Sequence, residues 1–398
     1  MKKSIIALAM TVAAIMPATA QKQEGLVMTP PMGWNSWNKF HTDIDEEKIK
    51  GIVDALVETG LRDAGYIYVN LDDAWHGKRD SLGWIQCDPV RFPSGMKALA
   101  DYVHSKGMKF GVYSDAGEQT CAMYPGSRGH EYQDAIQYAK WGVDYLKFDW
   151  FRQDLVGAEG AYTLMRDALY STRRPIVFSI CEWGENGTRK WAPRTGHLWR
   201  TGGDIGAYFS ESPCHEKPIL WCIENNNTYR ECAGPNAWND PDNLEVGNGM
   251  SINQDRAHFS LWCMMAAPLI LGNDVRNMTP EVLAIVSNRE AIAIDQDSLG
   301  IQGLRVKNEN GLQYWFKPLM NGDWAFCVLN TNKIPAQITL DWSKDFNFTD
   351  ELSRRSTDFS NITYGIRNIW TGKNDGKTDK ARTITVPGED VVMYRLIR

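Results

Sequence analysis

Long hydrophobic runs are scarce in this chain of 398 residues. After residue 20, no segment is long and charge-free enough to supply the roughly 20 apolar residues that a membrane-spanning helix needs. No extended run of lysine or arginine is present and the formal net charge is −6, so nucleic acid is not expected as a partner. The chain is 43% hydrophobic and 23% charged, which excludes a disordered protein and predicts a large globular one.

Cysteine and histidine are too sparse for a disulfide scaffold or a zinc site. Eight cysteines and seven histidines are scattered without any Cys-x-x-Cys or His-x-His spacing. Only the cluster of Cys214, Cys222 and Cys232 is a candidate for a disulfide bond. No Gly-x-Gly-x-x-Gly follows the first expected strand, so nothing indicates a dinucleotide. We expect neither a cofactor nor a metal.

The N-terminus carries a targeting pattern. Lys2 and Lys3 precede an apolar run from Ile5 to Met16, and the small residues Ala18 and Ala20 follow. This order predicts a signal peptide over residues 1–20. The mature protein is then expected to be soluble and exported, periplasmic or secreted, with no membrane anchor after cleavage.

Strand-like and helical patterns alternate through residues 21–303. Amphipathic stretches such as Glu46–Thr59 and Ala158–Thr172 separate the apolar runs. Eight such units predict a (β/α)8 TIM barrel as the catalytic domain, with an open doubly wound sheet as the alternative. The expected strands are Met32–Trp37, Tyr66–Asp72, Lys109–Asp115, Asp144–Trp150, Ile176–Trp183, His197–Asp204, Ala237–Asp242 and Leu269–Asp274.

Residues 304–398 have a different pattern. Short alternating segments such as Trp324–Leu329 and Ala336–Leu340 are separated by turn residues. Asn321-Gly322 between two apolar runs is a strong hairpin signal. We expect a C-terminal antiparallel β-sandwich domain with an accessory role.

Charged and aromatic residues gather where the expected barrel strands end. Because barrel active sites lie at the C-terminal strand ends, this gathering predicts one polar site. A single such Asp is commonly only a loop cap, but six strands share the feature. The residues are Asp72, Asp73, Tyr113, Asp115, Lys147, Asp149, Glu182, Arg200, Asp204, Asp240 and Asp242.

Lys147 and Asp149 stand two residues apart, so both side chains lie on one face of a strand. A lysine beside a carboxylate favours its ionised form, which suits a nucleophile. A buried structural Lys–Asp pair is the equal alternative. Asp204, in a Gly202-Gly203 turn, is the candidate for the acid and base of a glycosidase.

Seven motifs give the barrel region a resemblance to the α-galactosidases of glycoside hydrolase family 27. Together they cover residues 28–303, and the family's barrel and β domain agree with the pattern above. The motifs are Pro31-Met32-Gly33-Trp34-Asn35-Ser36-Trp37, Leu71-Asp72-Asp73-Ala74-Trp75, Gly111-Val112-Tyr113-Ser114-Asp115, Tyr145-Leu146-Lys147-Phe148-Asp149, Cys181-Glu182-Trp183, Trp199-Arg200 with Asp204, and Trp238-Asn239-Asp240-Pro241-Asp242.

The resemblance implies a retaining, exo-acting enzyme that releases terminal α-linked galactose from a carbohydrate substrate by double displacement. It makes Asp149 the nucleophile and Asp204 the acid/base. It assigns substrate binding to Trp37, Asp72, Asp73, Tyr113, Lys147, Cys181, Glu182, Arg200 and Asp242.

Three rival functions stay open. Two are activities of the same scaffold, α-N-acetylgalactosaminidase and β-L-arabinopyranosidase, and the third is a non-catalytic sugar-binding protein. Glu182 suits a free sugar hydroxyl better than an acetamido group, and the Asp72-Asp73 pair suits the O4 and O6 of galactose. The chain also departs from many relatives at Asn243, often methionine there, and after Asp149, where the expected cysteine is missing.

Overall fold

The computed structural model describes residues 22–151 and 157–398, so the predicted signal peptide lies outside the described residues. Eight parallel strands form one sheet in the order β10-β1-β2-β5-β6-β7-β8-β9. They match the eight expected strands and confirm the barrel. Their bounds are β1 Met32–Asn35, β2 Tyr68–Asn70, β5 Lys109–Asp115, β6 Tyr145–Asp149, β7 Val177–Cys181, β8 Leu198–Arg200, β9 Trp238–Asp240 and β10 Leu269–Leu271.

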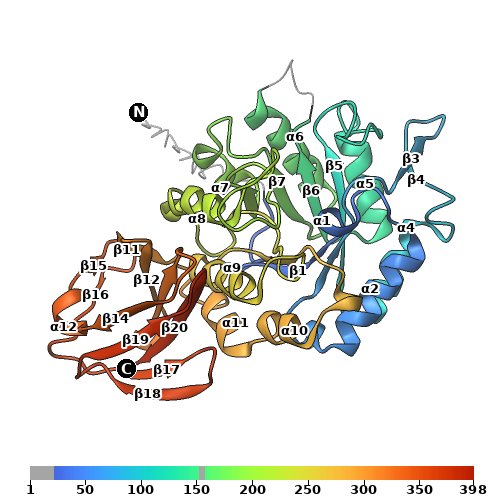
Figure 1. Cartoon of the computed structure of the whole chain (residues 1–398). Coiled ribbons are helices and arrows are strands. Elements are labelled where there is room, and N and C mark those ends of the chain that lie inside the picture. The colour runs from blue at the N-terminus through green and yellow to red at the C-terminus, as the bar shows by residue number, and fades with distance from the viewer. Residues whose placement is uncertain (1–21, 152–156) are drawn as a thin grey trace, which may run out of the picture.

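The segment after β9 closes the sheet into a barrel. Leu244 pairs in parallel with Leu271 of β10, and its N–H donates to the carbonyl of Ile270 at 2.7 Å. Figure 1 shows the strands surrounded by helices, with the C-terminal domain to one side. A hairpin that the alternation did not predict, β3 (His76–Arg79) and β4 (Ile85–Cys87), leaves the barrel after β2.

The barrel helices follow the amphipathic stretches of the sequence. Ser251 starts α9 with a capping box, in which its hydroxyl and the side chain of Gln254 each bond the other's backbone N–H. The amphipathic stretch Pro280–Ile292 is divided between two helices, because Asn288 caps a new helix with its side chain. The helices are α1 Trp37–Phe40, α2 Glu46–Glu58, α3 Leu61–Ala64, α4 Gly95–Ser105, α5 Glu131–Trp141, α6 Ala158–Ser171, α7 Ala192–Thr195, α8 Ile219–Asn227, α9 Ile252–Met265, α10 Pro280–Val286 and α11 Arg289–Asp295.

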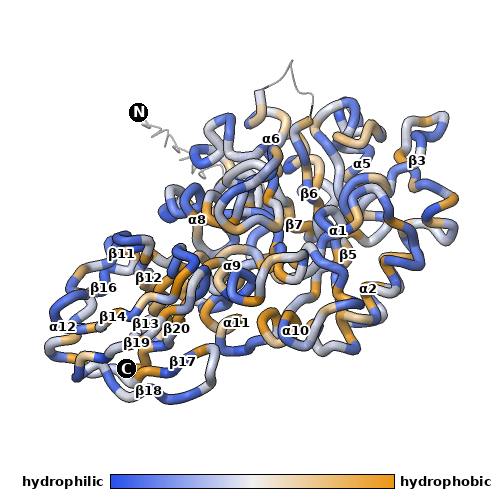
Figure 2. Tube along the Cα trace, viewed as in Figure 1, coloured by the Kyte–Doolittle hydropathy of each residue, from blue (hydrophilic) through white to orange (hydrophobic). Residues whose placement is uncertain are grey.

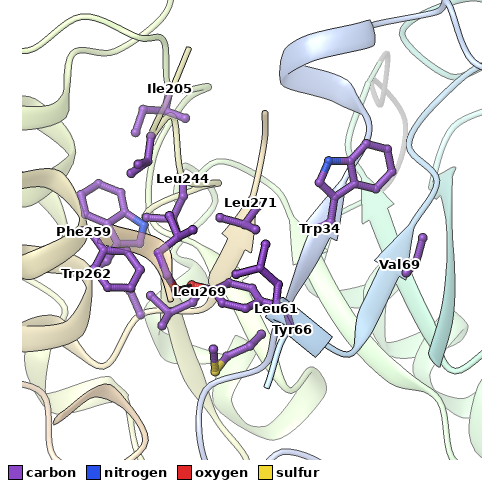
Figure 3. Close-up of a cluster of buried hydrophobic side chains, with 14 of the residues drawn as sticks. Trp34, Leu61, Tyr66, Val69, Ile205, Leu244, Phe259, Trp262, Leu269 and Leu271 are labelled. Carbon is purple, nitrogen blue, oxygen red and sulfur yellow. Dashed lines mark hydrogen bonds between the residues drawn. The ribbon is translucent and has the colours of Figure 1, made fainter. Parts of the chain in front are cut away.

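Apolar side chains from strands and helices join in one large core. Trp34 of β1, Leu269 and Leu271 of β10 and Trp262 of α9 are fully buried there (Figure 3). Indole rings also need partners for their N–H groups, and Trp34 and Trp262 donate theirs to the carbonyls of Asn273 and Asp242. The core therefore fixes the loops that follow β9 and β10, at the end where the active site is expected.

The C-terminal domain is antiparallel, as predicted. Its largest sheet has the order β11-β12-β13-β20-β17-β18, and Figure 2 shows hydrophobic residues along its central strands. The β12–β13 hairpin turns at Asn321 and Gly322, both left-handed with φ of 60° and 87°. The strands are β11 Leu304–Glu309, β12 Leu312–Pro318, β13 Trp324–Asn330, β14 Ala336–Leu340, β15 Thr349–Asp350, β16 Arg355–Ser356, β17 Gly365–Asn368, β18 Lys373–Lys377, β19 Arg382–Val386 and β20 Asp390–Ile397, with helix α12 at Trp342–Asp345.

The two parts of the chain share a buried interface. Trp315 of β12 and Met393 of β20 join the barrel core. The ammonium of Lys317 is buried there and donates to the carbonyls of Cys263, Ile294 and Asp295. All eight cysteines are free thiols, including those of the Cys214, Cys222 and Cys232 cluster. Among the described residues, no helix is both long and apolar enough to cross a membrane.

Candidate active site

A cavity of about 830 Å³ opens at the C-terminal ends of the barrel strands. Its volume lies within the range of about 300–1,000 Å³ that is usual for small-molecule sites. Seven of the residues predicted to form the site line it together, and they come from both halves of the barrel sequence. They are Trp37, Asp72, Lys147, Asp149, Arg200, Asp204 and Asp242.

Asp149 ends β6 and its carboxylate is buried at the cavity floor. The hydroxyl of Tyr113 donates to Oδ2 at 2.6 Å, and the N–H of Trp150 donates to Oδ1 at 2.9 Å. Burial raises the pKa of Asp149 to about 6, although Lys147 and the Tyr113 hydrogen bond lower it. Lys147 thus favours the ionised form of Asp149, as expected, but its effect on the pKa is smaller than that of burial.

Lys147 instead forms its closest ion pair with Asp72. Its Nζ lies 2.7 Å from Oδ2 of Asp72, and the amide of Asn35 donates to the same oxygen at 2.9 Å. The backbone N–H of Asp72 donates to the Ser36 hydroxyl, which ties β2 to β1. Lys147 and Asp72 thus present a donor and an acceptor side by side, which suits two neighbouring hydroxyls of a sugar.

Arg200 joins two carboxylates across the cavity. Its Nη2 lies 3.0 Å from Asp204 Oδ1 and 2.8 Å from Asp242 Oδ2. Burial acts to raise the pKa of Asp204, but the charges of Arg200 and Lys147 together lower it below its usual value. Burial raises the pKa of Asp242 to about 6. The Asp204 side chain is 47% exposed, whereas that of Asp242 is 7% exposed, so Asp204 is the accessible member of the pair.

Asp242 has φ of 97°, a conformation that costs energy in a residue with a side chain. Three donors hold this geometry: Arg200 and the N–H of Ile205 bind Oδ2, and the N–H of Asn243 binds Oδ1. The strain is therefore retained at a residue that faces the cavity.

Four of the predicted substrate-binding residues lie behind the cavity surface. Tyr113 supports Asp149, and the thiol of Cys181 lies 3.8 Å from Nη1 of Arg200. Asp73 is fully buried and accepts from the N–H groups of Ala74 and Ala122. Glu182 is also fully buried, and its carboxylate accepts from the N–H of Asn186 and the hydroxyl of Thr188.

Sequence reasoning missed cavity residues that follow the strand ends. Asn38 follows Trp37, and its Oδ1 accepts from Asn243 Nδ2 at 2.7 Å while its amide donates to Glu245. Trp183, Tyr208 and Glu216 also line the cavity. The types of these residues did not mark them as site residues. Their position in the segments that follow β1, β7, β8 and β9 was the available signal, because barrel active sites lie at these strand ends.

Comparison with known proteins identifies the family and its fold. A family model described as "Alpha galactosidase A" matches residues 29–297, and one described as "Alpha galactosidase C-terminal beta sandwich domain" matches residues 309–396. The chain belongs to the α-galactosidases of glycoside hydrolase family 27. The family confirms a glycoside hydrolase with a barrel and a C-terminal β-sandwich.

Individual family members are similar along nearly the whole chain. An "Alpha-galactosidase A" of Cellvibrio japonicus is 49% identical over 383 residues, which cover 95% of this chain and 94% of that protein. The crystal structure of α-galactosidase I from Mortierella vinacea is 33% identical, with a TM-score of 0.87 over 94% of this chain and 98% of that one. The α-galactosidase of Saccharomyces cerevisiae with raffinose is 31% identical, with a TM-score of 0.86 over 96% and 99%.

Proposed function

We propose that this protein hydrolyses terminal α-linked galactose with retention of configuration, through a covalent galactosyl-enzyme on Asp149. The observation that carries the proposal is the difference between two carboxylates of one cavity. Asp149 is buried and held by Tyr113 and Trp150, whereas Asp204 stands exposed beside Arg200. A fixed carboxylate suits attack, and an accessible one suits proton transfer with the leaving oxygen and then with water.

Binding of the substrate would place on Asp204 the proton that the first step needs. The negative charge of Asp204 is among the causes that raise the pKa of Asp149, so the two groups titrate together. A saccharide that covers the exposed Asp204 side chain removes water from it and raises its pKa. The proton then moves to Asp204, where it protonates the glycosidic oxygen, while Asp149 becomes the ionised nucleophile.

The remaining charged groups would hold the galactose ring. Lys147 and Asp72 offer a donor and an acceptor for neighbouring hydroxyls, and Asp242 and Arg200 offer a second such pair. Trp37 lines the cavity and supplies an aromatic face for the apolar C–H groups of the sugar. Because these groups would be left unpaired by a wrong epimer, they favour one hydroxyl arrangement.

In this proposal, Asp73 and Glu182 hold loops of the site in place. Asp73 holds the loop at Ala122, and Glu182 holds the loop from Asn186 to Thr188. The preference for galactose over an acetamido sugar therefore rests on the cavity groups and on the family's activity, rather than on the Glu182 carboxylate.

The decisive experiment compares p-nitrophenyl α-galactoside, α-N-acetylgalactosaminide and β-L-arabinopyranoside, with the released anomer followed by NMR. We expect the α-galactoside to give the highest kcat/KM and α-galactose to appear first. Release of β-galactose would exclude double displacement, and preference for another glycoside would overturn the galactose assignment.

We further propose that residues 1–20 are removed during export, and that the chain divides into a catalytic barrel at 21–303 and an accessory domain at 304–398. The patterns that support these proposals are the Lys2-Lys3 and apolar run at the N-terminus and the change of pattern after Gly303. Mass spectrometry of the exported protein tests the cleavage, because a mature chain that starts at Gln21 is expected.

A further inference from the structure

The segment 205–217 forms the wall of the cavity beside Asp204. Its two ends are pinned together, because the N–H of Lys217 donates to the carbonyl of Asp204 at 2.6 Å and the N–H of Gly206 donates to that of Lys217 at 3.0 Å. The N–H of Ile219 also donates to the carbonyl of Tyr208 at 2.8 Å. Backbone hydrogen bonds therefore hold the two ends of the loop together next to Asp204.

Two side chains of this loop converge next to Asp204. A methyl group placed on Gly206 would lie 2.5 Å from Oε2 of Glu216 and 2.8 Å from Cδ2 of Tyr208. Both side chains are half-buried and both line the cavity. Glycine at 206 thus lets a carboxylate and an aromatic ring lie together, two residues after Asp204.

Glu216 differs from the other carboxylates that line the cavity. Asp72, Asp149, Asp204, Asp242 and Glu245 each accept a hydrogen bond from a nitrogen donor or a hydroxyl. Within the described residues, the only donor to the Glu216 carboxylate is the thiol of Cys214, at 3.7 Å. Glu216 therefore keeps acceptor capacity that a ligand can use.

We propose that Glu216 and Tyr208 form the subsite for the sugar to which the galactose is attached. The inference rests on the proposed function, in which Asp204 protonates the glycosidic oxygen. The sugar that leaves with this oxygen therefore lies next to Asp204, on the side away from the galactose. Glu216 accepts hydrogen bonds from hydroxyls of that sugar, and the Tyr208 ring packs against its C–H face. The natural leaving group is thus a neutral saccharide rich in hydroxyls, rather than a lipid or an aromatic group.

The test compares raffinose, whose leaving group has many hydroxyls, with p-nitrophenyl α-galactoside, whose leaving group has none. Glu216→Ala is expected to lower the ratio of kcat/KM for raffinose to that for the aryl substrate roughly tenfold, mainly through KM for raffinose. Glu216→Gln keeps one acceptor oxygen and is expected to lower the ratio less. Tyr208→Ala is expected to lower it several-fold by loss of the ring.

Glu211→Ala is the matched control, since Glu211 is an exposed glutamate of the same loop that does not line the cavity. Its ratio should stay that of the wild type. Equal losses of kcat/KM on both substrates in Glu216→Ala would show an effect on Asp204 or on folding and would overturn the subsite. An unchanged ratio would overturn it as well. Wild-type protein inactive on both substrates would instead refute the proposed function, and the subsite with it.

Discussion

The hydroxyl of Tyr113 donates a hydrogen bond of 2.6 Å to Oδ2 of Asp149. Both residues are buried, and they lie on the adjacent strands β5 and β6, where Tyr113 is paired with Lys147. A hydrogen bond to a carboxylate stabilises its ionised form, so Tyr113 opposes the effect of burial on Asp149. In the proposed mechanism Tyr113 is then a positioning residue for the nucleophile.

Tyr113→Phe should therefore raise the pKa of Asp149 above about 6. Because this proton is the one that passes to Asp204 in the proposed first step, the alkaline limb of the pH profile of kcat/KM should move to higher pH. Loss of a hydrogen bond to a charged group corresponds to roughly a tenfold or larger fall in kcat/KM. Measurement from pH 3 to 9 with raffinose, whose leaving group needs the proton, checks both effects.

Tyr102→Phe supplies the control, because Tyr102 also donates to a carboxylate, that of Asp54, at 2.7 Å but on the barrel surface. Its pH profile should match the wild type. An unshifted alkaline limb in a folded Tyr113→Phe protein would remove Tyr113 from its positioning role.

Asp149→Asn removes the attacking oxygen but keeps the size of the side chain. Turnover should fall by several orders of magnitude, because no covalent intermediate can form. The melting temperature should not fall, since an amide removes a buried carboxyl group whose burial is unfavourable to its charge. Substantial activity in a folded variant free of wild-type protein would refute the assignment, and the exposed Asp101→Asn provides the inert comparison.

The pH dependence of the wild type follows from the same group of carboxyls. The pKa of Asp149 and that of Asp242 are both raised to about 6, so both carboxyl groups lose their protons as pH rises through about 6. The proposed first step needs one proton on Asp204 and an ionised Asp149. We expect kcat/KM for raffinose, whose leaving group needs this proton, to decline above about pH 6, and a constant kcat/KM up to pH 9 would contradict a proton shared in this cavity.

The position of the proposed nucleophile could be predicted because its strand is strongly patterned. Lys109–Asp115 was predicted residue for residue, and Asp149 ends its strand as expected. Side chains alternate between the two faces of a strand, and the residues that flank Lys147 and Asp149 are apolar. Together these features predict both the strand and the face on which Asp149 lies. The site at the strand ends then follows from the topology of the barrel.

Side-chain direction beyond the strand ends could not be predicted in the same way. Glu182 follows β7 directly, yet its carboxylate bonds the 186–188 loop rather than the cavity. Trp183 next to it has φ of 60° and lines the cavity. A single turn of this kind does not repeat along the sequence, so neither the period of a strand nor that of a helix predicts it. For the same reason the Asn38–Asn243 bond, which joins residues 205 positions apart, gave no signal.

Lys317 provides a test of the interface between the barrel and the C-terminal domain. Its ammonium donates to three carbonyls, and burial lowers its pKa. Lys317→Met keeps the length of the side chain but leaves these buried acceptors unpaired, which should lower the free energy of unfolding by roughly 2–4 kcal/mol. Lys307→Met, at a half-exposed surface ion pair, should change it by less than about 1 kcal/mol. Equal melting temperatures for the two variants would contradict the role of Lys317.

Asp204→Ala separates the acid/base from the nucleophile. Substrates with poor leaving groups need a proton on the glycosidic oxygen and should lose nearly all activity, while aryl substrates with acidic phenols should still galactosylate Asp149. Water then lacks its base, so the galactosyl-enzyme should accumulate. Azide needs no base and should attack this intermediate to give α-galactosyl azide.

The identity of the azide product distinguishes the two carboxylates. Asp149→Ala opens the opposite face of the sugar, so any azide product there should have the β configuration. In Asp204→Ala, kcat/KM should depend steeply on the pKa of the leaving phenol, and the trapped intermediate should appear by mass spectrometry of the intact protein. Equal damage for all leaving groups, with neither α-galactosyl azide nor a trapped intermediate, would exclude Asp204 as the acid/base. Asp242, which shares Arg200 with Asp204, would then be the carboxylate to test.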